Sequence, residues 1–159
     1  MADAAIDKST EELIGRIRLT GGLFAKDLSA STHEMLANLP GGKARSGYDI
    51  AYEVTGLNRL VAAKALGQSF DGPSGKGWVR APEDARDKEV ALRSFEESVD
   101  AVCSALAQMP VERQSESCDT PLGPLPLIRL AGIIPNHQMY HSGQLNYIQT
   151  LHGDEESHW

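Results

Sequence analysis

Hydrophobic residues recur at steps of three and four along most of the chain, which is the spacing of amphipathic α-helices. Ser9 and Thr10 come directly before two glutamates, as at a capped helix start. Gly21 and Gly22 interrupt the run that follows, whose apolar positions are Leu13, Ile17, Phe24, Leu28, Met35 and Leu39. The pattern predicts a first helix over about residues 10–39 that ends before a PGG motif.

A second apolar run begins after Ser46, a favourable N-cap residue, and extends to about Leu66 through Ile50, Val54, Leu57, Val61 and Ala65. A third run covers about residues 83–109, with a seam formed by Leu92, Phe95, Val99, Val102, Leu106 and Met109. Residues 67–82 between them contain four glycines and two prolines, so they do not fit a regular helix. Because this segment is long for a connection, we predict that it crosses between distant ends of a bundle.

The last apolar run covers about residues 122–152. Pro135 falls inside it and predicts a kink, and the tail after Gly153 is expected to fray. No stretch shows the alternation of a β-strand, and no internal repeat is found. Four long helices with a long crossover between the second and third predict an all-α fold, a four-helix bundle formed by residues 1–159 as a single domain.

The composition limits the function classes. A length of 159 residues with 41% hydrophobic content fits one domain with one core. The net charge of −7 and the lack of a basic cluster argue against a nucleic-acid partner. The N-terminus is neither a secretory signal nor a transit peptide, and no apolar run approaches the about 20 residues that cross a bilayer. Cys103 and Cys118 form no short metal or redox motif. We expect a cytoplasmic protein without a membrane partner.

Two histidines occupy the apolar row of the last helix, which reads Leu130, Ile133, Ile134, His137, His141, Leu145 and Ile148. A neutral imidazole that is buried without partners leaves two nitrogens unsatisfied, which is costly. His137 and His141 are four residues apart and share a helix face, with Cβ atoms about 6 Å apart. Both rings can therefore converge on one metal ion, although such a pair also arises by chance in many helices.

The second helix offers a third ligand. Glu53 lies at the edge of its apolar face, roughly 60° from Ile50 and 40° from Leu57 on a helical wheel. A buried glutamate needs a cation or a strong donor, so the residues together predict a metal site of Glu53, His137 and His141. Asp49, one turn earlier, is the reserve ligand, although a carboxylate in a first turn more often complements the helix N-terminus.

The neighbours of the two histidines fit either functional or structural roles. Gln144 and Asn136 can orient a ligand or a metal-bound water, or lie at the surface. Tyr140 is expected to pack, and Gly143 to allow a close helix contact. The remaining histidines lack a partner at ligand spacing, so we expect ordinary surface or hydrogen-bonded side chains at His33, His152 and His158.

Two segments resemble the DinB-like superfamily. The segment NHQMYHSGQLNYIQTLHGD, residues 136–154, is similar to the final helix of that family, where a WH-x3-H-x-GQL-type motif recurs. The segment ARSGYDIAYEVTGLNRLVA, residues 44–62, is similar to its second helix, in which a serine is followed seven residues later by a ligand. The resemblance implies that His137 and His141 are the paired ligands and that Glu53 takes the third place, where the family usually has histidine.

The ligand set and the resemblance leave two classes of function open. Two histidines and a carboxylate suit Zn²⁺ with an open position or non-haem Fe²⁺, and the resemblance adds Ni²⁺ and Mn²⁺. We favour Zn²⁺ or Ni²⁺. DinB-like relatives include thiol-dependent transferases and isomerases, which implies a small-molecule substrate such as a low-molecular-weight thiol, held as its thiolate by the metal. Hydrolysis by a metal-bound water is the other enzymatic option.

No separate general base stands out in the sequence, so no catalytic residue is assigned. The alternative is a non-catalytic bundle, with or without metal, that acts in a stress response or binds a small molecule. Members of the family frequently form dimers, so a homodimer is expected under either reading.

Overall fold

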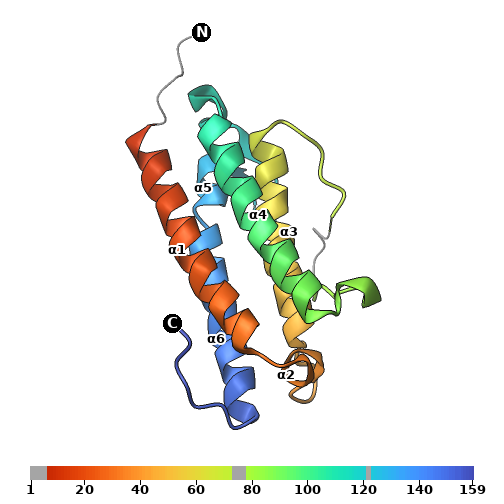
Figure 1. The fold of residues 1–159 in the computed structure, drawn as a ribbon. Helices are drawn as coiled ribbons and strands as arrows, with labels where there is room; N and C mark the ends of the chain where they lie inside the picture. Colours follow the sequence, from red (N-terminus) through yellow and green to blue (C-terminus); the bar gives the residue numbers. More distant parts are fainter. Residues whose placement is uncertain (1–6, 73–77, 121–122) are drawn as a thin grey trace.

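The computed structural model describes residues 7–72, 78–120 and 123–159. The long helices of this part of the chain are α1 (Lys8–Ala30), α3 (Gly47–Ala65), α4 (Lys88–Gln108) and α6 (Ile134–Leu151). Helices α1 and α3 each pack on both α4 and α6, and their facing sides form one core (Figure 1). The predicted all-α bundle is confirmed. Among the described helices, none has the length and apolar character that crossing a membrane requires.

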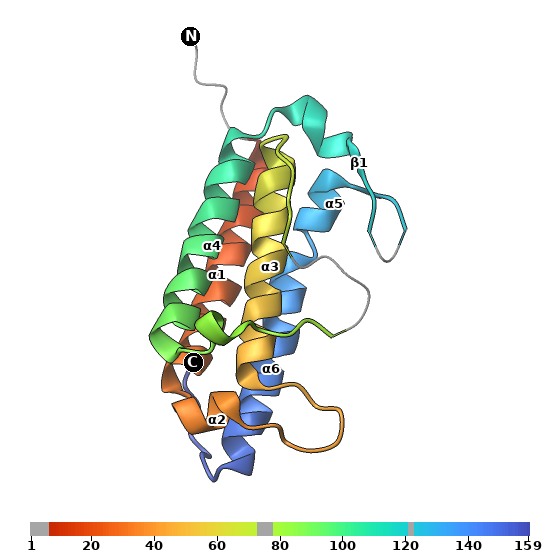
Figure 2. The ribbon, with the colours of Figure 1, turned by 90° about the vertical axis from the view of Figure 1, so that its right-hand side faces the viewer.

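Helices α1 and α6 run in one direction, and α3 and α4 run in the other (Figure 1). The hydrogen bonds between α3 and α4 agree, because Asp49 at the start of α3 bonds to Arg86 just before α4, and Asn58 bonds to Ser98 further along both helices. After α3 the chain must return along the bundle before α4 begins. Figure 2 shows the described residues of this connection beside α3. Positions 73–77 of the predicted connection lie outside the described residues.

The single helix predicted over residues 10–39 is wrong near its C-terminal end. The structure has α1 followed by a short helix, α2 (His33–Ala37). Ser31 and Thr32 adopt extended backbone, and the Thr32 hydroxyl accepts a hydrogen bond from the N–H of Met35. A side-chain hydroxyl at this point caps a new helix, so the chain changes direction although the apolar spacing continues.

The next two helices begin at N-cap residues. Ser46 caps α3, and its hydroxyl accepts from the N–H of Asp49 while the Asp49 carboxylate accepts from the N–H of Ser46. The third predicted helix begins later than expected. A short 3₁₀ helix, η1 (Glu83–Ala85), comes first, and α4 follows Asp87, whose carboxylate accepts from the N–H of Val90. At α3, the two reciprocal hydrogen bonds between Ser46 and Asp49 fix the start of the helix that carries Glu53.

The continuous helix predicted from about residue 122 is also wrong, and its expected start lies outside the described residues. The chain forms a 3₁₀ helix, η2 (Val111–Ser115), an antiparallel pair of two-residue strands, β1 (Ser117–Cys118) and β2 (Leu125–Pro126), and a short helix, α5 (Leu127–Ala131). Strands this short give no alternation in the sequence. Pro135 lies in the first turn of α6, where its missing N–H costs nothing, so it begins the helix instead of kinking it.

The tail after α6 folds back on the bundle, so the expected fraying is wrong. The indole Nε1 of Trp159 donates to both carboxylate oxygens of Asp27 in α1, at 3.0 and 2.9 Å. Asp27 is fully buried, and the hydroxyl of Ser142 in α6 also donates to it. A buried carboxylate requires such donors, and this need holds the tail in place.

Candidate metal centre

The structure brings Glu53, His137 and His141 together between α3 and α6. The Nε2 atoms of the two imidazoles lie 3.2 Å apart, and each lies 3.6 Å from Oε1 of Glu53. All three ligand atoms lie within 4.8 Å of one another. The ligands of a tetrahedral ion at about 2.1 Å from its centre lie about 3.4 Å from each other. The observed triangle therefore suits one ion with a fourth position left free.

Helix packing produces this triangle. His137 and His141 are one turn apart on α6, and their rings meet edge to face with centroids 4.4 Å apart. Helix α3 runs antiparallel to α6 and directs Glu53 to the same point. The side chain of His141 is 2% exposed, that of His137 is 20% exposed and that of Glu53 is 26% exposed. The site is thus closed on the side of His141 and reachable from solvent at the other two ligands.

A hydrogen bond fixes the tautomer of His141. Its Nδ1 lies 2.7 Å from Oε1 of Gln144, and a carboxamide oxygen only accepts. Nδ1 must therefore carry the proton, and Nε2 presents a lone pair to Glu53 and His137. Two states of His137 fit this arrangement. Its Nε2 can carry a proton and donate it to Nε2 of His141, or it can present a second lone pair, in which case both nitrogens face a shared cation. Gln144 is the kind of outer partner that orients metal-bound histidines.

Both imidazoles are neutral at pH 7. Burial lowers the pKa of His137 to about 4, and the positive charge of Arg45 contributes in the same direction. Burial lowers the pKa of His141 to about 3, with further lowering from His137 and Arg45 against an opposing effect of the Gln144 hydrogen bond. Metal ions bind unprotonated imidazole, so these rings are in the ligand-competent form well below neutral pH.

Arg45, which no sequence pattern marks as a site residue, contacts the triad. Its Nη1 forms an ion pair with Oε2 of Glu53, and its side chain is 5% exposed. The two carboxylate oxygens of Glu53 thus have different surroundings, a guanidinium at Oε2 and two imidazoles at Oε1. Arg45 lies in the segment before Ser46, where helical periodicity gives no signal. The need of a half-buried glutamate for a cation is the one signal that could have directed attention to it.

Asp49, the reserve ligand, takes no part in the triad. It is fully buried and accepts hydrogen bonds from the Ala81 N–H at 2.9 Å, from Arg80 at 3.0 Å and from Arg86 at 2.9 Å. Burial opposes the ionisation of this carboxyl, but the hydrogen bonds from Ala81, Ser46 and Arg80 outweigh it, so its pKa lies below the ordinary value. Asp49 joins the start of α3 to the segment that leads into α4.

The structure also locates the other polar neighbours. Tyr140 is 63% exposed, but its ring packs edge to face on His141 with centroids 4.9 Å apart, and its hydroxyl accepts from Gln144 at 3.2 Å. Gly143 is exposed, and a Cβ there would meet nothing within 4 Å, so the expected close helix contact is absent. Asn136 is exposed. The prediction for the other histidines is confirmed, because hydrogen bonds join His33 to Tyr48, His152 to Asn38 and His158 to Asp154.

Comparison with known proteins shows the fold. No protein-family model matches the chain, and no curated protein matches it in sequence. A crystal structure of a conserved protein from Enterococcus faecalis is 18% identical, with a TM-score of 0.71 over 91% of this chain and 97% of that one. A crystal structure of a DinB-like protein from Bacillus cereus is 18% identical, with a TM-score of 0.68 over 90% of this chain and 92% of that one. The chain therefore has the DinB-like fold that its two helical segments implied.

Proposed function

We propose that this chain is a metal-dependent enzyme in which Glu53, His137 and His141 hold one divalent ion. The observation that carries the proposal is the triangle of one carboxylate oxygen and two imidazole nitrogens, with sides of 3.2, 3.6 and 3.6 Å. Zn²⁺ and Ni²⁺ are favoured, and Fe²⁺ and Mn²⁺ also accept this ligand set. The ion supplies Lewis acidity, which lowers the pKa of a water or thiol bound at the fourth position. The reaction class is thiol transfer or hydrolysis of a small molecule.

The protein residues have separate tasks in this site. Gln144 keeps the proton of His141 on Nδ1, so that Nε2 stays available. Arg45 pairs with Oε2 of Glu53 and neutralises its charge, while Oε1 lies 3.6 Å from each imidazole Nε2. The charges of Arg45 and Glu53 cancel and the imidazoles are neutral, so a bound divalent ion is left with an excess of two positive charges. This excess favours an anionic fourth ligand, such as a thiolate or hydroxide.

A second candidate is a non-catalytic bundle that binds a small molecule, and the Arg45–Glu53 ion pair favours it. A guanidinium already supplies the cation that the half-buried carboxylate requires. His137 Nε2, at 3.2 Å from His141 Nε2, can donate its proton there. In this reading the site is satisfied without metal.

The metal content of purified protein tests whether the triad holds an ion. Wild-type protein and the variant His137→Ala, each equilibrated with zinc and then freed of loosely bound metal, are compared by elemental analysis. We expect one zinc per wild-type chain and none in the variant, because two ligands cannot retain it. The variant His152→Ala removes a histidine outside the triad and should keep its zinc. Equal metal content in wild type and His137→Ala would contradict the metal site.

An open coordination position separates the two candidates. Protein loaded with Co²⁺ is titrated with 2-mercaptoethanol, and the absorption spectrum is recorded. An accessible fourth position should give a sulfur-to-cobalt charge-transfer band that saturates with thiol. If cobalt binds at the triad but no such band forms, the thiol-transfer reading is wrong and the non-catalytic candidate is favoured.

A further inference from the structure

A pocket of about 370 Å³ lies beside the triad, between α6 and the segment that leads into α3. Arg45 and Gln144 line it, and these are the residues that contact Glu53 and His141. Among the described residues, none of the three candidate ligands lines the pocket. The pocket and the triad therefore share a wall but are separate spaces.

The charged residues that line the pocket are cations. Lys43 and Arg45 belong to the lining, and no aspartate or glutamate does among the residues that the structure describes. Glu53 balances the charge of Arg45 from behind the wall. Lys43 is exposed and has no ion-pair partner in the described parts of the chain. In a chain with a net charge of −7, this local excess of positive charge suits an anion.

Arg45 has hydrogen-bonding capacity left over. A guanidinium carries five N–H groups. The contacts of Arg45 are the ion pair to Glu53 and a long hydrogen bond of 3.4 Å to Gln144. Its other N–H groups have no hydrogen-bond partner in the described ranges, although the whole residue is 7% exposed. The Arg45 nitrogen that is buried without a hydrogen bond is Nη1, which faces Glu53, and the remaining N–H groups are available to an acceptor in the pocket.

The rest of the lining is apolar and includes two aromatic rings. Ile50 and Ile148 belong to this apolar lining, and Trp78 and Tyr147 are 61% and 63% exposed. The guanidinium carbon of Arg45 lies 4.5 Å from the centre of the Trp78 ring. An aromatic face next to a cation is suited to a flat apolar group that carries a negative charge at one end.

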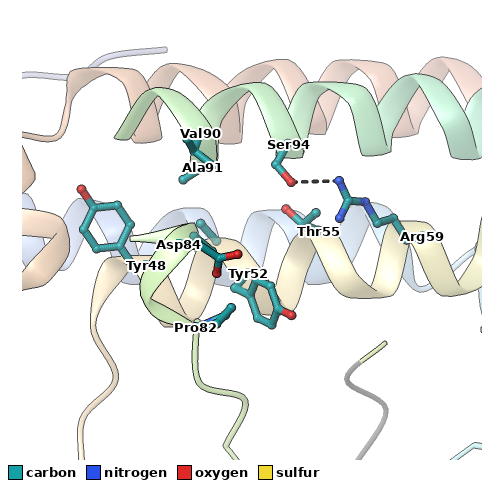
Figure 3. Close-up of a pocket in the computed structure, with 11 residues that line it drawn as sticks. Tyr48, Tyr52, Thr55, Arg59, Pro82, Asp84, Val90, Ala91 and Ser94 are labelled. Atoms are coloured by element: carbon teal, nitrogen blue, oxygen red, sulfur yellow. Dashed lines mark hydrogen bonds between the residues drawn. The ribbon is translucent and has the colours of Figure 1, made fainter. Parts of the chain in front are cut away.

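The pocket between α3 and α4 lacks this combination (Figure 3). It has a volume of about 230 Å³, and its cation, Arg59, donates to Ser94 at 2.9 Å, as the dashed line shows. Asp84 in the same lining supplies a negative charge. In this pocket the guanidinium of Arg59 is already hydrogen-bonded, and the carboxylate of Asp84 would repel an anion. The two pockets therefore differ in the charge of the ligand that they suit.

We propose that the pocket lined by Lys43, Arg45, Trp78 and Tyr147 binds a small organic anion with a flat apolar body. The anionic group lies at Lys43 and Arg45, and the body packs on Trp78 and Tyr147. This inference goes beyond the proposed function, because the pocket lies beside the metal centre and none of the described candidate ligands lines it. The binding itself requires no metal, because the candidate ligands among the described residues stand outside the pocket.

Calorimetric titration of chelator-treated protein tests the charge preference. The probes are 2-naphthoate and its uncharged counterpart 2-naphthamide, which have the same ring system. We expect 2-naphthoate to bind at least tenfold more tightly. The variant Lys43→Gln should reduce this preference several-fold, with little change in the affinity for 2-naphthamide. Equal affinities for the two probes in wild-type protein, or no binding of 2-naphthoate, would overturn the proposal.

A pocket-filling variant tests the location. Gly143 lines the pocket from α6, and nothing lies within 4 Å of a Cβ placed there, so Gly143→Met should fold and occupy the space. Gly22→Met is the matched control, because Gly22 is also exposed in a helix with nothing within 4 Å of its Cβ position. We expect at least a tenfold loss of 2-naphthoate affinity in Gly143→Met and none in Gly22→Met. Wild-type affinity in a folded Gly143→Met would overturn the assigned pocket.

Two further results separate this inference from the metal proposal and from a competing occupant. His137→Ala should bind 2-naphthoate as wild type does, which supports the pocket whatever the metal content of the protein. Loss of 2-naphthoate binding in that variant would overturn the pocket as a separate site. A stable dimer that is dissociated by Tyr147→Glu and that binds no 2-naphthoate would show instead that a second copy of the chain covers this face.

Discussion

Two carboxylates on α3, four residues apart, have opposite surroundings. Asp49 is fully buried and receives hydrogen bonds from backbone N–H groups and from two arginines. Glu53 is 26% exposed and has one arginine at Oε2, while two imidazole nitrogens lie 3.6 Å from Oε1. His141 Nε2 presents a lone pair and gives this oxygen no donor, and Nε2 of His137 can donate to only one of its two neighbours.

The difference shows what separates a structural carboxylate from a candidate ligand on the same helix. At Asp49 every neighbour donates, so the carboxylate is satisfied and joins two segments of the chain. At Glu53 one facing nitrogen is an acceptor and the other can donate to only one partner, so a cation is what would satisfy all three atoms at once. The type of neighbour, more than burial, distinguishes the two positions.

Loss of Asp49 should have the largest effect on stability. Asp49→Ala leaves Arg80, Arg86 and the Ala81 N–H without their acceptor and removes the capping contact with Ser46. We expect the free energy of unfolding to fall by about 3–5 kcal/mol, as for the removal of one partner from a buried ion pair. Urea denaturation measures this. Zinc content per folded chain should not change, and a stable Asp49→Ala protein that has lost its zinc would reverse the roles assigned to the two carboxylates.

The histidine pair of the triad and the buried carboxylate of Asp49 should lose their contributions to stability in different pH ranges. The pKa values of His137 and His141 are lowered from 6.5 to about 4 and about 3, so below pH 6.5 the unfolded chain binds protons that the folded chain does not. Stability in chelator should fall as pH drops from 6.5, by about 2 kcal/mol for each histidine at pH 5. Asp49 has a lowered pKa, so its contribution is present above 3.8, its ordinary value, and is lost below it.

Thermal and urea unfolding at a series of pH values measures both ranges. His141→Gln removes one of the two titrating imidazoles and should reduce the loss between pH 6.5 and 5 by about half. A free energy of unfolding that is constant between pH 7 and 5 would contradict the buried, neutral state of this pair.

Removal of Arg45 should lower the free energy of unfolding less than removal of Asp49 does, and it should increase the affinity for zinc. Arg45→Gln deprives the partly exposed Glu53 of its cation, so in chelator we expect a loss of about 1–2 kcal/mol. Zinc affinity should increase, because the guanidinium both neutralises the carboxylate and repels a metal ion. Zinc should restore the lost stability. Arg18→Gln, which removes an exposed ion pair with Asp100, is the control. Reduced zinc affinity in Arg45→Gln would mean that Arg45 holds Glu53 in position for the metal.

The triad could be predicted because helical periodicity determines which residues share a face. His137 and His141 interrupt an aliphatic row at a spacing of one turn, and Glu53 borders the facing row, so their meeting required only that the two helices pack. Periodicity could not separate Asp49 from Glu53. The donors of Asp49 come from Arg80, Ala81 and Arg86, in a connection whose path depends on tertiary contacts.

The parts of the fold that were predicted wrongly also depend on contacts that helical periodicity does not specify. The break at Ser31 and Thr32 depends on local capping, which competes with a continuous apolar pattern. The return of Trp159 depends on a buried carboxylate more than one hundred residues away in sequence. Arg45 and the cationic pocket depend on loop residues without periodicity. Each of these features is a polar contact, and hydrophobic spacing does not encode the partners of polar groups.

Anomalous diffraction at the zinc edge, from crystals grown with zinc, tests the central claim most directly. The account predicts one strong peak between α3 and α6, bonded at about 2.1 Å to Oε1 of Glu53 and to Nε2 of His137 and His141. An ordered site with no peak at that position, in which Glu53 pairs with Arg45 alone and His137 bonds to His141, would contradict it.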